Sequence, residues 1–270
     1  MTYRLRIFFG GDIAKDGNID NSVRYAASKF AHIHFTTLES HKQNLIKLGE
    51  EEFRIFVIGN PGLDKFFETE YLPKEEVTTN IGMTIKGNDK YCVLIQHPII
   101  NEVEEQSKHI RHTLDAILES GMKCFINYPN SDAGYFPIIE AYNEYTSKFS
   151  NLKLFNNLDR VNYINLLRYA SCLLGNSSSG ILEAPTLHLP VINIGNRQRG
   201  RFSSNNVIFV DNDKEQIIKA INKALYDSEF ISLIKNTPNP YGDGNSSNKV
   251  VEILSSIELN NKLIYKNITY

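Results

Sequence analysis

Short apolar runs alternate with amphipathic segments along most of the chain. This alternation of period-two runs and helical segments is typical of α/β proteins with parallel sheets. The predicted strands are Leu5–Phe9, His32–Thr36, Arg54–Ile58, Tyr91–Gln96, Lys123–Asn127, Leu152–Phe155, Cys172–Leu174, Val191–Ile194 and Val207–Phe209. The predicted helices are Ser22–Phe30, Glu39–Leu48, Glu102–Glu119, Phe136–Thr146, Arg160–Ala170, Lys214–Tyr226 and Lys249–Ser255.

Changes in this pattern divide the chain. Residues 1–71 hold only three strands, fewer than a complete Rossmann sheet, so we expect the chain to begin in the middle of a domain. Residues 72–88 are charged and weakly periodic, which favours an interdomain connection. Residues 89–245 carry a full β/α series that ends in a turn-rich stretch. Residues 246–270 are predicted to form a final helix and a polar tail that frays.

Composition narrows the class of protein. Of 270 residues, 41% are hydrophobic and 22% charged, and the net charge of -2 gives no basic field for nucleic acid. No apolar run is long enough to span a membrane. Cys92, Cys124 and Cys172 lie in strand-like runs without metal-ligand spacing. They are expected to be buried, reduced thiols, which favours a cytoplasmic location.

A strand, a polar turn and a helix start follow one another from Cys172 to Ala184. Cys172–Leu174 is the strand, Gly175–Gly180 is a run of small residues with hydroxyl groups, and Ile181–Ala184 is the helix start. Unpaired N–H groups and the positive end of a helix dipole favour an anion at such a place.

The next strand, Leu189–Ile194, is followed by three arginines, Arg197, Arg199 and Arg201, which a parallel sheet could bring to the same crevice. Glu183 is a poor neighbour for phosphate but a good acceptor for a vicinal diol such as ribose. Together these groups favour a nucleoside diphosphate, with or without a sugar attached. The alternative is a serine-rich turn with a helix cap and solvated arginines.

Two further loops follow buried strands, where ligands bind in parallel sheets. His97 comes directly after one strand and before Pro98, and could donate to a phosphate, transfer a proton or simply cap the sheet. Asn130 lies in the loop Tyr128–Gly134 and could contact a base or a phosphate, or form an Asn/Asp turn.

The loop Gly10–Asp20 follows the first strand. Its paired glycines permit close approach to a ligand, and its carboxylates include Asp20 as a candidate acid or base. Arg24 lies one turn further and could pair with Asp20 or reach the crevice. A solvated loop that caps the next helix explains the same residues equally well.

Seven motifs, in this order, resemble those of the hydrolysing UDP-N-acetylglucosamine 2-epimerases of sialic acid biosynthesis and of their relatives that act on UDP-diacetylbacillosamine. They are GGDIAKDGNIDNSVRYAASK, IGNPGLD, QHP, YPNSDAG, GNSSSGILEAP, INIGNRQRGR and NPYGDGNSS. The resemblance implies two Rossmann-like domains of the glycosyltransferase-B type, the first incomplete here. It also implies a C-terminal helix that returns to the first domain and a homodimer, as is usual in the family.

The resemblance also assigns roles at the nucleotide. Ser177 and Ser178 match the diphosphate-binding serines, and Glu183 matches the ribose-binding carboxylate. Arg197 matches a nucleotide-contacting arginine. His97 matches the active-site histidine beside the diphosphate and is one of the two expected catalytic residues.

The remaining matches concern two further contacts to the nucleotide and the residues at the sugar. Asn130 and the backbone of Leu158 fall where the family contacts the nucleotide. Asp20 matches a catalytic carboxylate and Arg24 lies close to it. The implied reaction is elimination of UDP followed by hydration, which needs no metal or redox cofactor. Its partner is a UDP-sugar, and the sequence does not fix which sugar.

Two departures from the family favour an alternative. The family begins with a further half-domain of roughly 90 residues, and many members carry a polar residue before the glycine pair, where this chain has Phe9. A truncated paralogue that binds UDP with impaired catalysis is therefore the second hypothesis. A glycosyltransferase of the same fold is disfavoured by the serine-rich motif.

Overall fold

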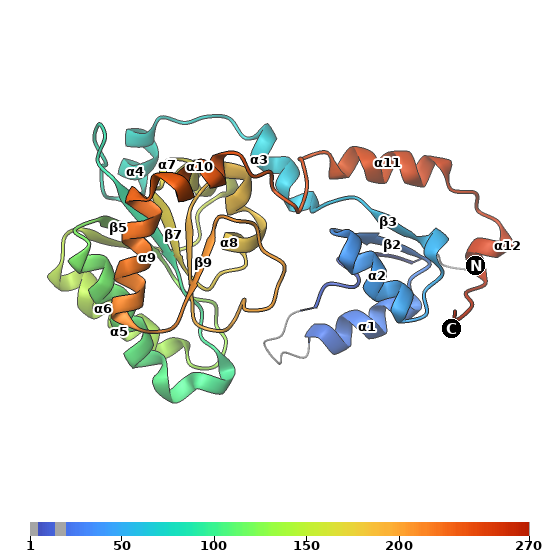
Figure 1. Cartoon of the computed structure of the whole chain (residues 1–270), viewed down its shortest axis with the longest axis horizontal. Helices are drawn as coiled ribbons and strands as arrows, with labels where there is room; N and C mark the ends of the chain where they lie inside the picture. Colours follow the sequence, from blue (N-terminus) through green and yellow to red (C-terminus); the bar gives the residue numbers. More distant parts are fainter. Residues whose placement is uncertain (1–4, 14–19, 270) are drawn as a thin grey trace. The chain divides into compact units, whose positions relative to one another are not determined.

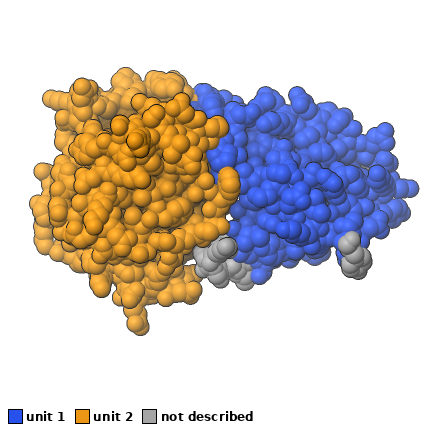
Figure 2. All heavy atoms as spheres, in the orientation of Figure 1, with its two compact units in different colours: residues 1–68, 239–270 blue, residues 69–238 orange. Residues whose placement is uncertain are grey.

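The chain forms two compact units, as a computed structural model shows for residues 5–13 and 20–269. Unit 1 comprises Met1–Glu68 and Asn239–Tyr270, and unit 2 comprises Thr69–Pro238 (Figure 2). Unit 2 is therefore one continuous stretch of chain inserted between the two pieces of unit 1. Within the described ranges, no helix is long and apolar enough to cross a membrane.

Unit 2 is built on a six-stranded parallel sheet (Figure 1). Its strands are β4 (Tyr91–Ile95), β5 (Lys123–Asn127), β6 (Leu152–Phe155), β7 (Cys172–Gly175), β8 (Val191–Ile194) and β9 (Val207–Val210). Their order is β6-β5-β4-β7-β8-β9, with every pairing parallel. This is the order of a doubly wound Rossmann sheet, in which the chain changes direction between β4 and β7.

Helices cover both faces of this sheet, because successive strand residues point to opposite sides. Cys92 and Leu94 of β4 face one core cluster, whereas Tyr91 and Val93 face another. The helices of the first cluster are α5 (Gln106–Glu119), α6 (Tyr135–Lys148), α9 (Lys214–Tyr226) and α10 (Ser228–Lys235). Those of the second are α4 (Lys74–Ile81) and α7 (Arg160–Tyr169), with the short α8 (Ser179–Leu182) beside them. Short 3-10 turns span Ile100–Glu105 and Ala184–Leu187.

The stretch 72–88 differs from the predicted connection. It contains α4, which packs against α7, and it buries Val77, Ile81 and the following Ile85 in the second core cluster. The polar residues that weakened the helical pattern lie on the exposed side, while Thr78 is buried and accepts the N–H of Ile85 at 3.1 Å. Unit 2 thus begins at Thr69 and ends at Pro238, rather than spanning residues 89–245.

Unit 1 is a three-stranded parallel sheet in the order β1-β2-β3. The strands are β1 (Arg6–Phe8), β2 (Ile33–Thr36) and β3 (Ile55–Val57). Its helices are α1 (Asp20–Phe30), α2 (Glu39–Lys47), α3 (Asp64–Glu68), α11 (Ser246–Ser256) and α12 (Asn261–Ile264), with 3-10 turns at Glu52–Arg54 and Pro61–Leu63. All nine strands predicted from the apolar runs are therefore present in the two units.

The carboxylate of Asp64 attaches α11 to unit 1. It accepts the backbone N–H groups of Ser246 at 3.1 Å and Ser247 at 2.8 Å, and the hydroxyl of Ser247 at 2.6 Å. A carboxylate at the amino end of a helix accepts from free N–H groups and interacts favourably with the positive end of the helix dipole. Apolar side chains of α11, among them Ile253, then cover Ile33 and Phe35 of the sheet.

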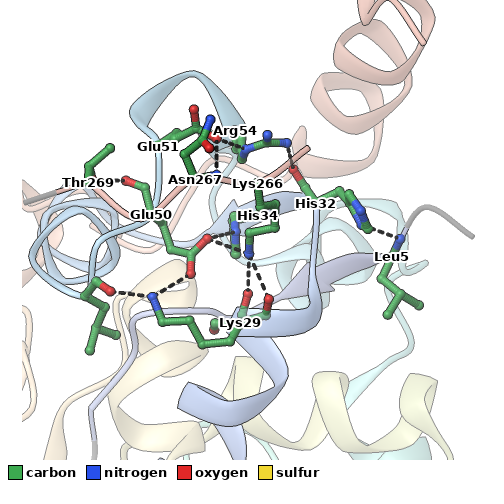
Figure 3. A network of polar contacts seen from close by, with 12 residues as sticks. Leu5, Lys29, His32, His34, Glu50, Glu51, Arg54, Lys266, Asn267 and Thr269 are labelled. Atoms are coloured by element: carbon green, nitrogen blue, oxygen red, sulfur yellow. Dashed lines mark hydrogen bonds and ion pairs between the residues drawn. The ribbon is translucent and has the colours of Figure 1, made fainter. Parts of the chain in front are cut away.

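The tail after α11 is held rather than frayed, contrary to the prediction from its polar composition. The buried guanidinium of Arg54 donates to the carbonyl oxygens of Lys262, Leu263 and Tyr265 at 2.6–2.8 Å. Lys266 forms an ion pair with Glu50 at 2.7 Å (Figure 3). These contacts join parts of the chain about two hundred residues apart, so no local pattern could reveal them.

Candidate functional site

The candidate site lies at the carboxyl ends of β4 and β7, where the strand order of unit 2 reverses. Gly175, the last residue of β7, has φ of 115°, a conformation that side chains rarely adopt. A Cβ there would meet the carbonyl oxygen of Ile95 at 2.1 Å. Glycine is thus required for the end of β7 to lie this close to the end of β4, at the switch point where ligands bind in such sheets.

Asn176 joins the loops that follow β4, β7 and β8. Its side-chain oxygen accepts the N–H of His97 at 2.7 Å, and its side-chain amide donates to the carbonyl of His97 at 2.9 Å. The carbonyl of Asn176 accepts from Arg197 at 3.0 Å and from Gln198 at 3.2 Å. Asn176 is buried, so these bonds form away from competing water and order all three loops.

The imidazole of His97 is held by the loop after β5. Its Nδ1 accepts the backbone N–H of Asn130 at 3.1 Å. Burial and the nearby positive charge of Arg197 lower the pKa of His97 to about 4, against the opposing effect of Asp132. The side-chain nitrogen of Asn130 donates to Asp132 at 2.6 Å, and the side-chain oxygen Oδ1 of Asn130 is buried without a hydrogen-bond partner among the described residues. Such an oxygen is open to a donor from a ligand.

The serine turn differs in part from its prediction. The helix after it, α8, is a single turn, so its dipole is small. Ser177 accepts the backbone N–H of Ser179 at 3.2 Å, and Ser178 is half-buried and makes no capping bond. Gly180 lies so close to β8 that a Cβ would meet Val191 at 2.7 Å. The turn therefore offers hydroxyl and backbone donors, with little help from a helix dipole.

Glu183 lies in a chain of hydrogen bonds beside this turn. One of its oxygens pairs with Arg160 at 2.9 Å, and the other accepts the hydroxyl of Ser179 at 2.6 Å. That hydroxyl also contacts the hydroxyl of Tyr163 at 2.6 Å, whose pKa is raised by burial and then by Glu183. Leu158, in the loop before Arg160, is half-buried and packs on the second core cluster.

The three arginines after β8 separate in the structure. Arg197 donates to Asn176 and so belongs to the site. Arg199 is exposed and pairs with Asp211 at 2.7 Å, and Arg201 donates to the side chain of Gln198 at 3.1 Å. We expected one loop to present all three arginines to a ligand, but among the described residues only Arg197 of the three is bonded to Asn176.

Asp20 and Arg24 belong to unit 1, apart in the chain from the residues above. Asp20 is the first residue of α1 and is exposed. Arg24 donates to the carbonyl of Asp12 at 2.7 Å and to the side chain of Asn21 at 3.4 Å. Residues 14–19 of the preceding loop lie outside the described residues. Phe9, the departure from the family pattern, has φ of 61°, which strains a bulky side chain.

Sequence reasoning missed four residues of the site. Asn176 follows a buried strand directly, so the rule that selected His97 could have selected it as well. Gln198, Arg160 and Tyr163 give no such signal, because their contacts depend on how α7 and the β8 loop pack. In the described part of the chain, no group of three potential metal ligands occurs, and the three cysteines are buried free thiols.

A scan against family models matches residues 8–255 to the family described as UDP-N-acetylglucosamine 2-epimerase. The chain belongs to this family. A UDP-N,N'-diacetylbacillosamine 2-epimerase (hydrolyzing) from Legionella pneumophila is 34% identical over 257 residues, which cover 95% of this chain and 66% of that protein. A GDP/UDP-N,N'-diacetylbacillosamine 2-epimerase (hydrolyzing) from Campylobacter jejuni is 36% identical over 217 residues, or 78% of this chain and 55% of that protein.

The fold prediction is confirmed by solved structures. The UDP-GlcNAc 2-epimerase of Neisseria meningitidis, solved with UDP-GlcNAc bound, superposes with a TM-score of 0.76 at 21% identity. The match covers 94% of this chain and 70% of that one. This chain therefore shares the α/β architecture of the epimerases, although it spans two thirds or less of the length of the two curated relatives.

Proposed function

We propose that this chain is a hydrolysing UDP-sugar 2-epimerase, which converts UDP-N-acetylglucosamine or UDP-diacetylbacillosamine into UDP and the free 2-epimeric sugar. The observation that carries the proposal is the set of loops joined by Asn176, in a chain that belongs to this family. It brings His97 and Arg197 together at the switch point of a Rossmann sheet, where a nucleotide is bound in this type of fold.

Each candidate residue has a role in the proposed complex. Arg197, His97 and the hydroxyls of Ser177 and Ser178 contact the diphosphate. Glu183 accepts from the ribose hydroxyls.

Two other loops contact the nucleotide, through Asn130 and the backbone of Leu158. In unit 1, Asp20 handles the proton at C2 of the sugar, and Arg24 binds the substrate. The side-chain oxygen of Asn130, which has no hydrogen-bond partner among the described residues, supports the proposed contact, because an amide or hydroxyl of the nucleotide could donate to this oxygen.

The reaction proceeds in two balanced steps. A carboxylate takes the proton from C2 while the C1–O bond breaks and UDP leaves with the electron pair, which gives a C1–C2 double bond. Water then adds its hydroxyl to C1 and a proton to the opposite face of C2. Negative charge grows on the leaving diphosphate, so Arg197 and the neutral donors stabilise the transition state more than the bound substrate.

A turnover assay tests this proposal. Purified protein is incubated with UDP-N-acetylglucosamine in deuterated water, and UDP, free N-acetylmannosamine and deuterium at C2 are measured. UDP-diacetylbacillosamine is assayed in parallel to identify the sugar. Release of UDP with a deuterated 2-epimer supports the proposal. UDP binding without turnover of either sugar would contradict it and favour a UDP-binding paralogue.

A pair of variants tests the position of the site. Arg197→Ala removes a charged contact and should weaken UDP binding by about tenfold to a hundredfold in calorimetry. Ser178→Ala removes a neutral contact and should weaken it by less. Arg199→Ala, which removes only an exposed charge paired with Asp211, is the matched control. Equal affinity of the Arg197 and Arg199 variants would show that the diphosphate lies elsewhere.

We further propose that the enzyme acts in the cytoplasm as a homodimer. Three buried free cysteines support a cytoplasmic location, where thiols stay reduced. The product class would supply sialic or legionaminic acid biosynthesis. Self-association as a homodimer is supported by β1, which pairs with β2 alone among the described strands. Sedimentation velocity tests this part independently of turnover.

A further inference from the structure

The two nitrogens of the His97 ring have different surroundings. Nδ1 accepts the backbone N–H of Asn130 at 3.1 Å. A backbone nitrogen can only donate, so Nδ1 must present its lone pair, and the single proton of a neutral ring lies on Nε2. No hydrogen bond of Nε2 occurs within the described ranges.

The backbone of His97 is held by hydrogen bonds on both sides, at its N–H and at its carbonyl. The side chain of Asn176 accepts from the N–H of His97 and donates to its carbonyl, which also fixes which end of the Asn176 amide is which. Asn176 is itself tied to β4, because its N–H donates to the carbonyl of Ile95 at 3.1 Å. These buried bonds fix the backbone from which the ring projects, and rotation of the imidazole would break its bond to the N–H of Asn130.

Charges around the ring also oppose a second proton. The charged groups that face His97 are the guanidinium of Arg197 and the carboxylate of Asp132. Asp132 is occupied by the side-chain amide of Asn130 at 2.6 Å. A proton on Nδ1 would in addition point at the N–H of Asn130, so the imidazolium ion would lose one hydrogen bond and gain a repulsive contact.

We propose that His97 acts as a donor that is neutral at the pH of the reaction, which offers its Nε2–H to the ligand and transfers no proton, with Asn130 and Asn176 as its positioning residues. The identity of the ligand as a diphosphate rests on the proposed function, whereas the state of the ring does not. A neutral donor suits this leaving group, since a phosphate with a second pKa near 6 needs no proton to depart at neutral pH. The hydrogen bond strengthens as charge reaches the diphosphate oxygens.

Nitrogen-15 NMR of ring-labelled histidine tests the ring directly in the intact chain. The signal of His97 is identified by its absence in His97→Gln. It should show the Nε2–H tautomer, without titration, from about pH 5.5 to pH 8, in contrast to an unperturbed histidine with a pKa of about 6.5. A titration midpoint above about pH 6, or the Nδ1–H tautomer, would overturn the proposal.

The positioning role of Asn176 has its own spectroscopic readout. Asn176→Ala removes both contacts to the His97 backbone, so the ring signal should split or average between tautomers and begin to titrate closer to pH 6.5. A loss of stability with the ring signal unchanged would show that Asn176 is merely structural. If this variant does not fold, the wild-type titration decides the proposal by itself.

Two substitutions then separate a donor from an acid. Glutamine places its amide nitrogen close to the position of Nε2, whereas asparagine reaches only as far as Nδ1. His97→Gln should therefore bind UDP about tenfold more tightly than His97→Asn. Wild-type affinity should stay level from about pH 7.5 to pH 9, where the phosphates are fully ionised. Affinity that falls across this range, or equal affinity of both variants, would contradict a neutral donor.

These measurements keep the two proposals apart. A neutral, non-titrating His97 in a chain that does not bind UDP would refute the proposed function and leave the state of the ring established. UDP turnover together with a titrating His97 would support the epimerase and refute the neutral donor.

Discussion

Unit 1 and unit 2 each hold a histidine at the sheet, and the two side chains have opposite uses. His34 lies within β2, wholly buried, and its Nε2 contacts Glu50 at 3.1 Å (Figure 3). His97 lies just past β4, and a backbone N–H occupies its Nδ1. An ionised carboxylate only accepts, so His34 carries a proton on Nε2, and a backbone N–H only donates, so the proton of a neutral His97 also lies on Nε2. In unit 1 that proton is used inside the protein, whereas in unit 2 it remains for a ligand.

The charges around the two rings explain the difference. Glu50 is surrounded by His34, Lys29 and Lys266, and the carboxylate is almost completely buried. Burial by itself would raise its pKa, but hydrogen bonds from His34, Lys266 and Lys29 outweigh that effect and lower the pKa to about 2. Among the described residues no carboxylate is bonded to the ring of His97, and Arg197 affects its pKa more than Asp132 does. A contact with a buried carboxylate holds His34 inside unit 1, whereas burial and then a neighbouring guanidinium keep His97 neutral.

Removal of the carboxylate from unit 1 should have the largest effect. Glu50→Ala leaves His34 and two lysines without their common partner, so unit 1 should lose about 3–5 kcal/mol of unfolding free energy in urea titrations. Glu52→Ala is the control, because its side chain is 68% exposed and pairs with Lys42 at the surface. A loss below about 1 kcal/mol for Glu50→Ala would show that the cluster is not structural.

The pH dependence of stability should separate the two histidine environments. The pKa of His97 is about 4 when folded and about 6.5 when unfolded. Its contribution is therefore present above about pH 6.5 and is lost as the pH falls to about 4, a total of about 3 kcal/mol. Urea unfolding of unit 2 between these pH values measures the loss, which His97→Gln should abolish.

The contribution of Glu50 should vanish in a lower window. Its folded pKa of about 2 lies below the ordinary value of 4.5, so unit 1 loses this stabilisation only as the pH falls from about 4.5 to 2. Glu50→Gln should abolish the loss of stability in this pH range and leave the loss that His97 causes at higher pH unchanged. A single shared window for both units would undo the contrast between the two sites.

The guanidinium of Arg54 should matter less than the carboxylate but remain measurable. Arg54→Lys keeps the charge and loses the planar fork that reaches three carbonyl groups of the tail. We expect a loss of about 2 kcal/mol and faster cleavage of residues 257–269 by protease. Arg199→Lys is the matched control in unit 2. Equal cleavage of the two variants would mean that Arg54 does not hold the tail.

The smallest effect is expected for Arg199→Ala. Its exposed ion pair with Asp211 should contribute less than about 1 kcal/mol, and less still at high salt. A large loss of stability in this variant would indicate that the loop after β8 depends on Arg199 as well as on Asn176.

The strands were predictable because buried parallel strands are short apolar runs between turns, as Tyr91–Ile95 illustrates. Helix α4 was missed because Lys74, Glu75 and Glu76 at its start obscure a short buried stripe. Among site residues, His97 and Asn130 follow from their positions after strands. The arrangement around Asn176 was not predictable, since it depends on how three loops meet and not on any spacing in one of them.

The division of unit 1 into two separated pieces of chain affects how the protein is made. Unit 2 is continuous, so its sheet and both cores are complete once residue 238 has left the ribosome. Arg54 and Glu50 are synthesised before unit 2, but their partners at residues 262–266 follow the whole of it. The part of unit 1 that precedes unit 2 must therefore wait, with Arg54 and Glu50 still lacking their contacts to the tail, until synthesis of the tail allows unit 1 to close.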